Sequence, residues 1–216
     1  MIKISIQFFG GRGAKSGAVR TKIVPGSYAQ YNSESESDNA MGLHNGGEAD
    51  KWMKSLNPDE RNAVEAYSGS TYITLNDALR EGTASSMSDY HKDIDKNLET
   101  ALSTFTLDKP TTFVRGSTAD LLGGASTVAE INAMKGQIVI DKGYTSSSTV
   151  RAFSSDIVYH INTPAGKGIG AYIKGLSHYT TENEFLFNKN SIFTVKQAYQ
   201  KGSQVHVDID YYGRMS

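Results

Sequence analysis

Two glutamates stand directly before an apolar run in the stretch Tyr179-Thr180-Thr181-Glu182-Asn183-Glu184-Phe185-Leu186-Phe187. The aromatic residues and leucine of this run are typical of a buried β-strand. Because side chains two residues apart on an extended chain point to the same face, we expect Glu182 and Glu184 to project together into one cleft. In isolation, the pair also fits two exposed acids at a strand start, so its meaning depends on the segments before it.

Two earlier segments place polar groups beside β-type runs. Phe113-Val114-Arg115-Gly116 puts an arginine after such a run and follows it with a glycine, which lets a ligand approach the backbone closely. Gly143-Tyr144-Thr145-Ser146-Ser147-Ser148 gathers a cluster of serines behind a tyrosine. Taken alone, the arginine fits a surface charge at a strand end, and the serines fit a turn.

Taken in order, the arginine, the serine cluster and the Glu-x-Glu stretch resemble the mono-ADP-ribosyltransferases of the Arg/Ser/Glu class. The pattern is most similar to the enzymatic components of clostridial binary toxins and the related exoenzymes, and it covers roughly residues 58–212. The resemblance implies an α+β fold of the ADP-ribosyltransferase type, with two packed, mostly antiparallel sheets and N-terminal helices. It also implies NAD as a co-substrate and chemistry without a metal.

The resemblance assigns roles near the nicotinamide end of NAD. Arg115 would hold a phosphate, the backbone of Gly116 would pair with the nicotinamide amide, and Phe153 would lie near the ring. Ser146 would hydrogen-bond the catalytic carboxylate and fix its rotamer. The chain departs from the aromatic-Ser-Thr-Ser pattern of the family by carrying Ser147 in place of the threonine.

A helical segment further upstream completes the predicted cofactor site. Tyr67, Tyr72, Asn76 and Arg80 match positions that line the adenine and phosphate side of NAD in the family. Asn76 and Arg80 stand four residues apart and therefore share a helix face, and a planar guanidinium suits diphosphate oxygens. The alternative is that the tyrosines pack in the core and that Arg80 is a surface charge.

The two acids suit the cleavage of a glycosidic bond. Breaking the nicotinamide–ribose bond builds positive charge on the ribose, and a fixed carboxylate stabilises charge that appears only in the transition state. We assign this role to Glu184, which by the resemblance also binds the ribose 2′-hydroxyl. Glu182 would assist an arginine guanidinium, which attacks poorly while protonated. Tyr179 matches the family's acceptor-recognition aromatic, whereas His178 beside it has no assigned role.

The remaining pattern predicts an α+β domain. Residues 48–105 are helical in pattern, with Asn57 before Pro58 and Ser88 as start signals. The last of these helices carries a core stripe at helical spacing, formed by Tyr90, Ile94, Leu98, Leu102 and Phe105. Short β-type runs follow Pro110, at residues 111–114, 137–140, 157–161, 170–173, 184–187, 192–195 and 205–209.

The 216 residues suffice for one domain with an extra tail. We interpret residues 1–50, rich in Gly, Ser, Asn and charge, as a flexible or loosely docked N-terminal tail, and residues 51–216 as the ADP-ribosyltransferase domain. Within the tail, residues 7–17 resemble a segment of some phage structural proteins. A net charge of −1 gives no electrostatic case for nucleic-acid binding, and the absence of cysteine excludes disulfides and thiolate chemistry.

The sequence also predicts where the protein works and in what form. The scattered histidines lack the spacing of a metal site. No apolar segment approaches the ~20 residues of a membrane span, and the start of the chain does not fit a signal peptide. We expect a soluble monomer without a membrane partner, in the cytoplasm of the producing or host cell or associated with a virion.

These observations predict an NAD-dependent protein-arginine mono-ADP-ribosyltransferase whose partner is a protein that presents an accessible arginine. Two alternatives stay open. One is an NAD glycohydrolase that depletes the NAD of a host cell. The other is a phage structural protein that keeps a degenerate transferase domain.

Overall fold

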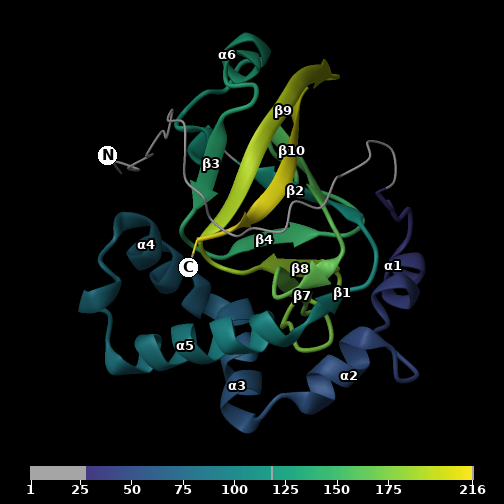
Figure 1. Cartoon of the computed structure of the whole chain (residues 1–216), viewed down its shortest axis with the longest axis vertical. Coiled ribbons are helices and arrows are strands. Elements are labelled where there is room, and N and C mark those ends of the chain that lie inside the picture. Colours follow the sequence, from purple (N-terminus) through teal and green to yellow (C-terminus); the bar gives the residue numbers. More distant parts are fainter. Residues whose placement is uncertain (1–27, 118, 216) are drawn as a thin grey trace, which may run out of the picture.

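The computed structural model describes residues 28–117 and 119–215, with helices first and strands after them (Figure 1). The helical elements are α1 (Glu34–Met41), α2 (Glu48–Ser55), α3 (Pro58–Ala66), η1 (Tyr67–Thr71), α4 (Tyr72–Glu81), η2 (Ala84–Ser86), α5 (Asp89–Thr104), η3 (Ala119–Leu122) and α6 (Val128–Ala133). The strands are β1 (Thr106–Leu107), β2 (Thr111–Ser117), β3 (Ile138–Asp141), β4 (Thr145–Ser148), β5 (Ile157–Thr163), β6 (Gly166–Lys167), β7 (Gly170–Tyr172), β8 (Glu184–Phe187), β9 (Ser191–Lys201) and β10 (Gln204–Arg214). None of the helices in these ranges is long and apolar enough to cross a membrane.

Local capping signals start two of the helices where the sequence predicts. The side chain of Asn57 accepts a hydrogen bond from the backbone of Glu60 at 2.9 Å, and the Glu60 carboxylate accepts one from the Asn57 backbone at 3.0 Å. Pro58 occupies the first turn of α3, where its missing N–H costs no hydrogen bond. Ser88 caps α5 by accepting from the backbone of His91. Both predicted helix starts are confirmed.

The apolar stripe of α5 is confirmed except at its first member. Ile94, Leu98 and Leu102 are buried, as is Phe105 just after the helix, but Tyr90 is 54% exposed. A row of residues four apart winds around a helix, because each step of four turns the side chain about 40° past a full turn. Tyr90 therefore lies on a different face of α5 from Leu102 and is exposed to solvent.

The strands form a mostly antiparallel arrangement, which confirms the predicted α+β class. Eight strands lie in the order β3-β9-β10-β5-β2-β4-β8-β7, and β1 pairs with β6 in a second sheet. Among the named strands only β10 and β5 run parallel. Since β2 and β4 share one residue pair, Val114 with Ser148, the large sheet bends between them. In Figure 1, β4 and β8 run across the direction of β9 and β10. Helices α3 and α5 lie on the other side of β8 from β9 and β10, and α4 lies to the left of β4.

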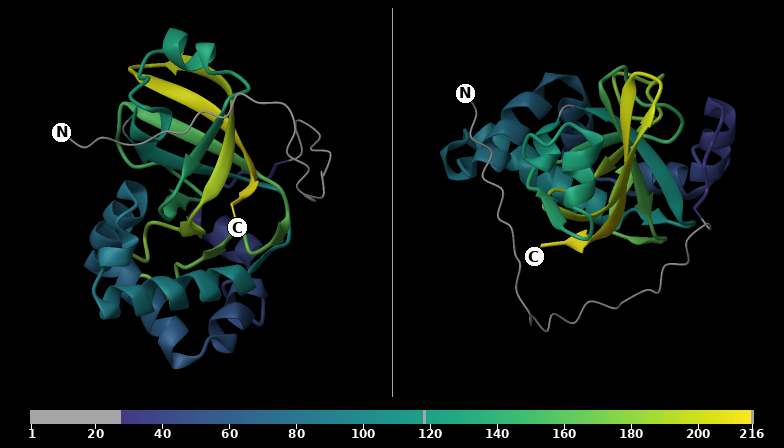
Figure 2. Two further views of the ribbon diagram at one scale, coloured as in Figure 1. Left: turned by 60° about the vertical axis from the view of Figure 1, so that its left-hand side comes forward. Right: turned by 90° about the horizontal axis from the view of Figure 1, so that it is seen from above.

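Each predicted β-type run falls on a strand to within one residue, and three strands were missed: the two-residue strands β1 and β6, and β4. β4 carries the serine cluster, which has too few branched or aromatic residues to give a strand signal on its own. It forms because it fits between its neighbours, pairing Thr145–Ser148 with Glu184–Phe187 of β8. The left view of Figure 2 shows the helices drawn in blue at one end of the strands and α6 at the other.

An aromatic cluster joins the two parts of the sheet. Phe113 of β2 stacks on Phe185 of β8 with ring centroids 4.1 Å apart, and Phe187 meets Phe113 at 5.4 Å. Phe105, after α5, contacts Phe185 from the helical side. Because side chains alternate along a strand, burying Phe185 and Phe187 in this core turns Glu184 to the opposite face.

The predicted tail at residues 1–50 is wrong for the part that the structure describes. Residues 28–50 contain α1 and the start of α2, Ala29 bridges to Thr111, and Ser33 caps α1. The prediction of a tail rested on the small apolar area that this stretch could bury. In the structure α1 docks mainly through polar contacts, with Met41 as an apolar anchor. Residues 1–27, including the stretch that resembles phage proteins, lie outside the described residues.

Leu98→Ala is expected to lower the free energy of unfolding by about 2–5 kcal/mol, because it empties a fully buried site on α5. Tyr90→Ala, on the exposed side of the same helix, should change it by no more than about 0.5 kcal/mol. Urea denaturation of the two variants measures both effects. Equal costs would contradict the burial difference found along α5.

Candidate active site

One cavity of about 600 Å³ brings together all the residues that the sequence predicts for the site. They are Tyr67, Tyr72, Asn76, Arg80, Arg115, Gly116, Ser146, Phe153, Tyr179, Glu182 and Glu184. They come from η1, α4, β2, β4, β8 and the loops that follow β4 and precede β8. The cavity therefore lies where the helical layer meets the bend of the large sheet.

Glu184 is the buried acid of this cavity. It begins β8 opposite Ser148 of β4, and this register brings its carboxylate to Ser146, whose Oγ donates to Oε1 at 2.6 Å. Burial raises the pKa of Glu184 to about 7, and the nearby charge of Glu182 adds to the rise. The hydrogen bond from Ser146 and the charge of Arg115 act in the opposite direction.

Glu182 reaches the cavity by a route that the sequence does not predict. Asn183 has a left-handed backbone with φ of 50°, and Glu182 lies in a turn before β8. The expected extended chain across the three residues is therefore wrong, because a left-handed residue changes the direction of the chain. Both carboxylates still line one cavity. Glu182 is partly exposed, and burial raises its pKa.

Arg115 lies on β2 beside the serine strand. Its Nη1 donates to the carbonyl oxygen of Ser146 at 2.5 Å, so the guanidinium and the Glu184 carboxylate are held by the same residue. Burial lowers the pKa of Arg115, but a guanidinium remains protonated at neutral pH. Gly116 follows it, and a Cβ there would lie 2.1 Å from the carbonyl oxygen of Phe153. The glycine is thus required for the Phe153 loop to lie against β2.

Arg80 has a partner that sequence reasoning missed. Its Nε and Nη2 bind the two oxygens of Asp141 at 2.9 and 3.0 Å, a bidentate ion pair. Burial alone would raise the pKa of Asp141, yet Arg80 and the hydroxyl of Thr145 hold it below the usual value. The only signal in the sequence is an acid at the end of the strand Ile138–Asp141. Much of the Arg80 guanidinium is therefore occupied before any ligand binds.

Tyr67 and Asn76 bind each other as well as lining the cavity. The Asn76 amide donates to the Tyr67 hydroxyl at 2.9 Å and accepts from the backbone of Tyr144 at 2.8 Å. Tyr67 is buried, as the packing interpretation expects, and burial raises its pKa above the ordinary value. Gly143 allows this contact, because a Cβ there would lie 2.7 Å from the Asn76 oxygen.

The rim of the cavity is exposed and aromatic. Tyr72, Phe153 and Tyr179 are 45%, 54% and 55% exposed, and Ile73 beside Tyr72 is 52% exposed. Ile73 was missed because its position in α4 carries no motif. The other lining residues missed by sequence reasoning are Ser68, Gly69, Ser70 and Tyr144. Ser68 and His178 are in contact, since the Ser68 hydroxyl accepts from the His178 backbone at 3.1 Å.

Within the described residues there is no group of three or more His, Cys, Asp or Glu that could hold a metal ion. The cavity gathers the guanidiniums of Arg80 and Arg115, two carboxylates and a serine hydroxyl, on a bent, mostly antiparallel sheet with helices before it. This set has the arginine, serine and Glu-x-Glu pattern in which the sequence resembles the mono-ADP-ribosyltransferases.

The chain belongs to the ADP-ribosyltransferase exoenzyme family, whose model matches residues 44–210. Among curated proteins it is similar to the NAD(+)--arginine ADP-ribosyltransferase EFV of Enterococcus faecalis, with 27% identity over 153 residues, or 69% of this chain and 31% of that protein. It is also similar to the mono(ADP-ribosyl)transferase SpvB of Salmonella typhimurium, with 26% identity over 71% of this chain and 25% of SpvB. The chain thus spans about a third or less of the length of these relatives.

The fold is also that of solved ADP-ribosyltransferases. The structure of C3stau2 from S. aureus with NAD superimposes with a TM-score of 0.72 at 16% identity, covering 87% of this chain and all of that one. At this identity the likeness concerns the fold alone.

Glu184→Gln is expected to stabilise the protein at pH 8. Because the folded pKa lies above the unfolded one, the wild-type carboxyl favours folding below its ordinary pKa, and this contribution is lost as the pH rises through about 7. The amide keeps an acceptor for Ser146 without the charge, so the variant should gain about 1–3 kcal/mol at pH 8 and nothing at pH 4. Urea denaturation at both pH values measures this.

Glu81→Gln is the matched control, because Glu81 is exposed at the end of α4. It should change the free energy of unfolding at neither pH. A loss of stability in Glu184→Gln at pH 8 would show that the buried charge is compensated.

Proposed function

We propose that this chain transfers ADP-ribose from NAD to an arginine side chain of another protein and releases nicotinamide. The observation that carries the proposal is the pair of acids on one cavity wall, with Glu184 buried against Ser146 and Glu182 nearer the solvent. Family membership supports the transferase chemistry, and the Enterococcus relative is named for arginine. The cavity volume of about 600 Å³ is ordinary for a small-molecule site.

The first step is the departure of nicotinamide. The bond between the ribose carbon C1′ and the ring nitrogen breaks, both electrons stay with the nitrogen, and neutral nicotinamide leaves. The ribose becomes an oxocarbenium-like cation. An ionised Glu184, itself buried in the cavity wall, stabilises this charge. The hydrogen bond from Ser146 already holds this carboxylate in one orientation, so the carboxylate does not have to be reoriented when the positive charge develops.

The diphosphate needs a cation on the same wall. Arg115 meets this need, since its bond to the Ser146 carbonyl leaves the rest of the guanidinium fork for phosphate oxygens. Arg80 takes a smaller share than the sequence pattern suggests, because its bidentate face holds Asp141. NAD is thus placed with its phosphates near Arg115 and its ribose near Glu184.

The second step is attack by the acceptor arginine. A guanidine nitrogen bonds to C1′ from the face opposite the departed nicotinamide, the configuration inverts, and the nitrogen gives its proton to Glu182. The raised pKa of Glu182 makes it a better proton acceptor than an ordinary carboxylate. The exposed side chain of Tyr179 lies on the same rim, where a protein surface can reach it.

Substituting the two acids is expected to affect NAD hydrolysis and ADP-ribose transfer differently. Glu184→Gln should lower both NAD hydrolysis and transfer by about 100-fold or more, since both need the stabilised cation. Glu182→Gln should lower transfer by about 100-fold and leave hydrolysis within about threefold, since water needs less help from a base than a protonated guanidinium does. Nicotinamide release and mass-spectrometric mapping of lysate proteins after incubation with labelled NAD measure the two activities.

Three results would overturn this proposal. Retention of wild-type transfer by both variants would reject the assigned roles. Nicotinamide release by the wild-type chain without any labelled protein would identify an NAD glycohydrolase. No turnover, with no NAD binding by calorimetry, would identify a degenerate domain.

The reaction should depend on the ionisation of Glu184. Only the anion stabilises the ribose cation, so kcat/KM for NAD should fall about tenfold per unit as the pH drops below about 7. In Glu182→Gln this acid limb should move to lower pH, because the charge of Glu182 helps to raise the pKa of Glu184. Hydrolysis measured from about pH 5 to about pH 8 tests this, and a flat profile would contradict it.

A further inference from the structure

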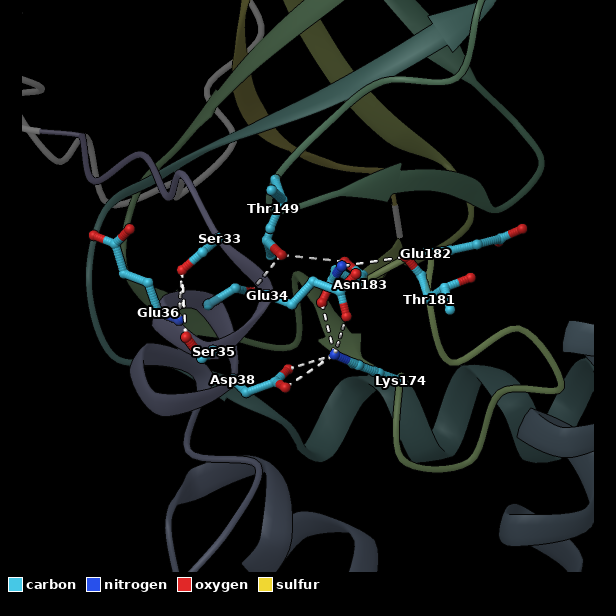
Figure 3. Close-up of polar contacts among 12 residues, drawn as sticks. Ser33, Glu34, Ser35, Glu36, Asp38, Thr149, Lys174, Thr181, Glu182 and Asn183 are labelled. Atoms are coloured by element: carbon cyan, nitrogen blue, oxygen red, sulfur yellow. Dashed lines mark hydrogen bonds and ion pairs between the residues drawn. The ribbon is translucent and has the colours of Figure 1, made fainter.

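Asn183, between the two acids, is fixed by groups outside its own turn (Figure 3). Its carbonyl oxygen accepts from the backbone and the hydroxyl of Thr149 at 3.1 and 3.2 Å. Its side-chain oxygen accepts from Nζ of Lys174 at 2.8 Å and lies 3.2 Å from the hydroxyl oxygen of Tyr172. The left-handed backbone of Asn183 is therefore held in place by its surroundings.

Lys174 is the charged member of this network. Its Nζ lies 2.9 and 3.0 Å from the two carboxylate oxygens of Asp38, and the side chains are only 10% and 16% exposed. The Tyr172 hydroxyl donates to the same Asp38 carboxylate at 2.7 Å. Glu34 of α1 lies 3.5 Å from the same Nζ, so both acids that face Lys174 come from α1. Removing Lys174 leaves the buried charge of Asp38 uncompensated.

The support for this network comes from α1. Asp38 lies on α1, and so does Ser37, whose Oγ lies 2.5 Å from the hydroxyl oxygen of Thr149. Both residues that hold Asn183 from outside, Lys174 and Thr149, are thus themselves held by α1. We call Ser37, Asp38, Thr149 and Lys174 the α1 brace. In Figure 3, α1 lies directly across from the turn that carries Glu182.

The α1 brace matters more for Glu182 than for Glu184. Glu184 has its own support in the hydrogen bond from Ser146 and in the pairing of β8 with β4. Glu182 is held only through its backbone, whose carbonyl accepts from the Ser148 hydroxyl at 2.7 Å and whose N–H donates to Tyr179. Among the described residues, no side-chain hydrogen bond restrains the Glu182 carboxylate. Movement at Asn183 therefore displaces Glu182 first.

We propose that Lys174, paired with Asp38, is a positioning residue for Glu182 and sets how much NAD turnover ends in transfer rather than hydrolysis. The inference rests on the proposed function. When the α1 brace is broken, Glu182 no longer meets the guanidinium nitrogen at the ribose. Water still reaches the cation that Glu184 stabilises, so hydrolysis continues.

Lys174→Met in the full chain tests the inference, with NAD and the small guanidine agmatine as the acceptor. Agmatine removes any contribution of protein docking. The kcat of transfer to agmatine should fall about tenfold or more, because a displacement of about 1 Å in a catalytic group costs rate on this scale, while hydrolysis stays within about twofold. Nicotinamide release without agmatine and ADP-ribosyl-agmatine detected by mass spectrometry give the two rates.

Lys189→Met is the matched control. Lys189 is nearly as buried as Lys174, at 13% exposure, but its Nζ pairs with Asp95 and Glu99 of α5 and not with the turn that carries Asn183. Its loss should lower stability without changing the ratio of transfer to hydrolysis. Asp38→Asn is a milder second variant that keeps the side-chain shape and removes the charge, and it should show the same selective loss of transfer as Lys174→Met.

The outcomes separate the two proposals. Transfer by the wild-type chain, with an unchanged ratio in both Lys174→Met and Asp38→Asn, overturns the positioning role alone. A parallel loss of both activities, matching that in Lys189→Met, also overturns it and assigns Lys174 to stability. A wild-type chain that releases nicotinamide but never modifies agmatine overturns the proposed function, and this inference with it.

Discussion

The hydrogen bond from the Ser146 hydroxyl to the buried carboxylate of Glu184 is the contact on which the site depends. It exists because β4 and β8 pair in one register, and that register is set by the burial of Phe185 and Phe187 against Phe113. A slip of one residue would turn Glu184 into the aromatic core and expose the phenylalanines. The packing that stabilises the fold is therefore the same packing that orients the acid.

Local patterns were enough to predict much of this arrangement. The caps at Asn57 and Ser88, the β-type runs and the contact between Ser146 and Glu184 all follow from neighbouring residues or from a family resemblance. What the sequence could not show were contacts between distant segments. The ion pair of Arg80 with Asp141 and the docking of α1 on Lys174 join residues far apart in the chain, and their sequence signals are single charged residues. Such residues look the same on a solvated surface.

The two acids illustrate the same division between local and distant causes. Glu184 sits on a regular strand, so its direction follows from alternation. Glu182 faces the cavity because Asn183 is left-handed, and that conformation is held by Lys174 after β7 and Thr149 after β4, which in turn contact α1. The prediction that both acids line one cavity is confirmed, but the extended chain from which it was drawn is not what the structure shows. In the proposed mechanism, the acid that acts only on the acceptor is thus the one placed by long-range contacts, so its position can change without loss of the first step.

The raised pKa of Glu184 also connects substrate binding with ionisation. Burial makes the empty site favour the protonated acid near neutral pH, since the pKa lies at about 7. In the proposed binding mode, NAD brings the positive nicotinamide ring close to this carboxyl, and a nearby positive charge lowers the pKa of a carboxyl group. By linkage, NAD would then bind more tightly to the ionised form and release a proton as it binds. On this proposal the carboxyl of the empty site gains its charge as the cationic ring arrives, next to the ribose that the charge stabilises.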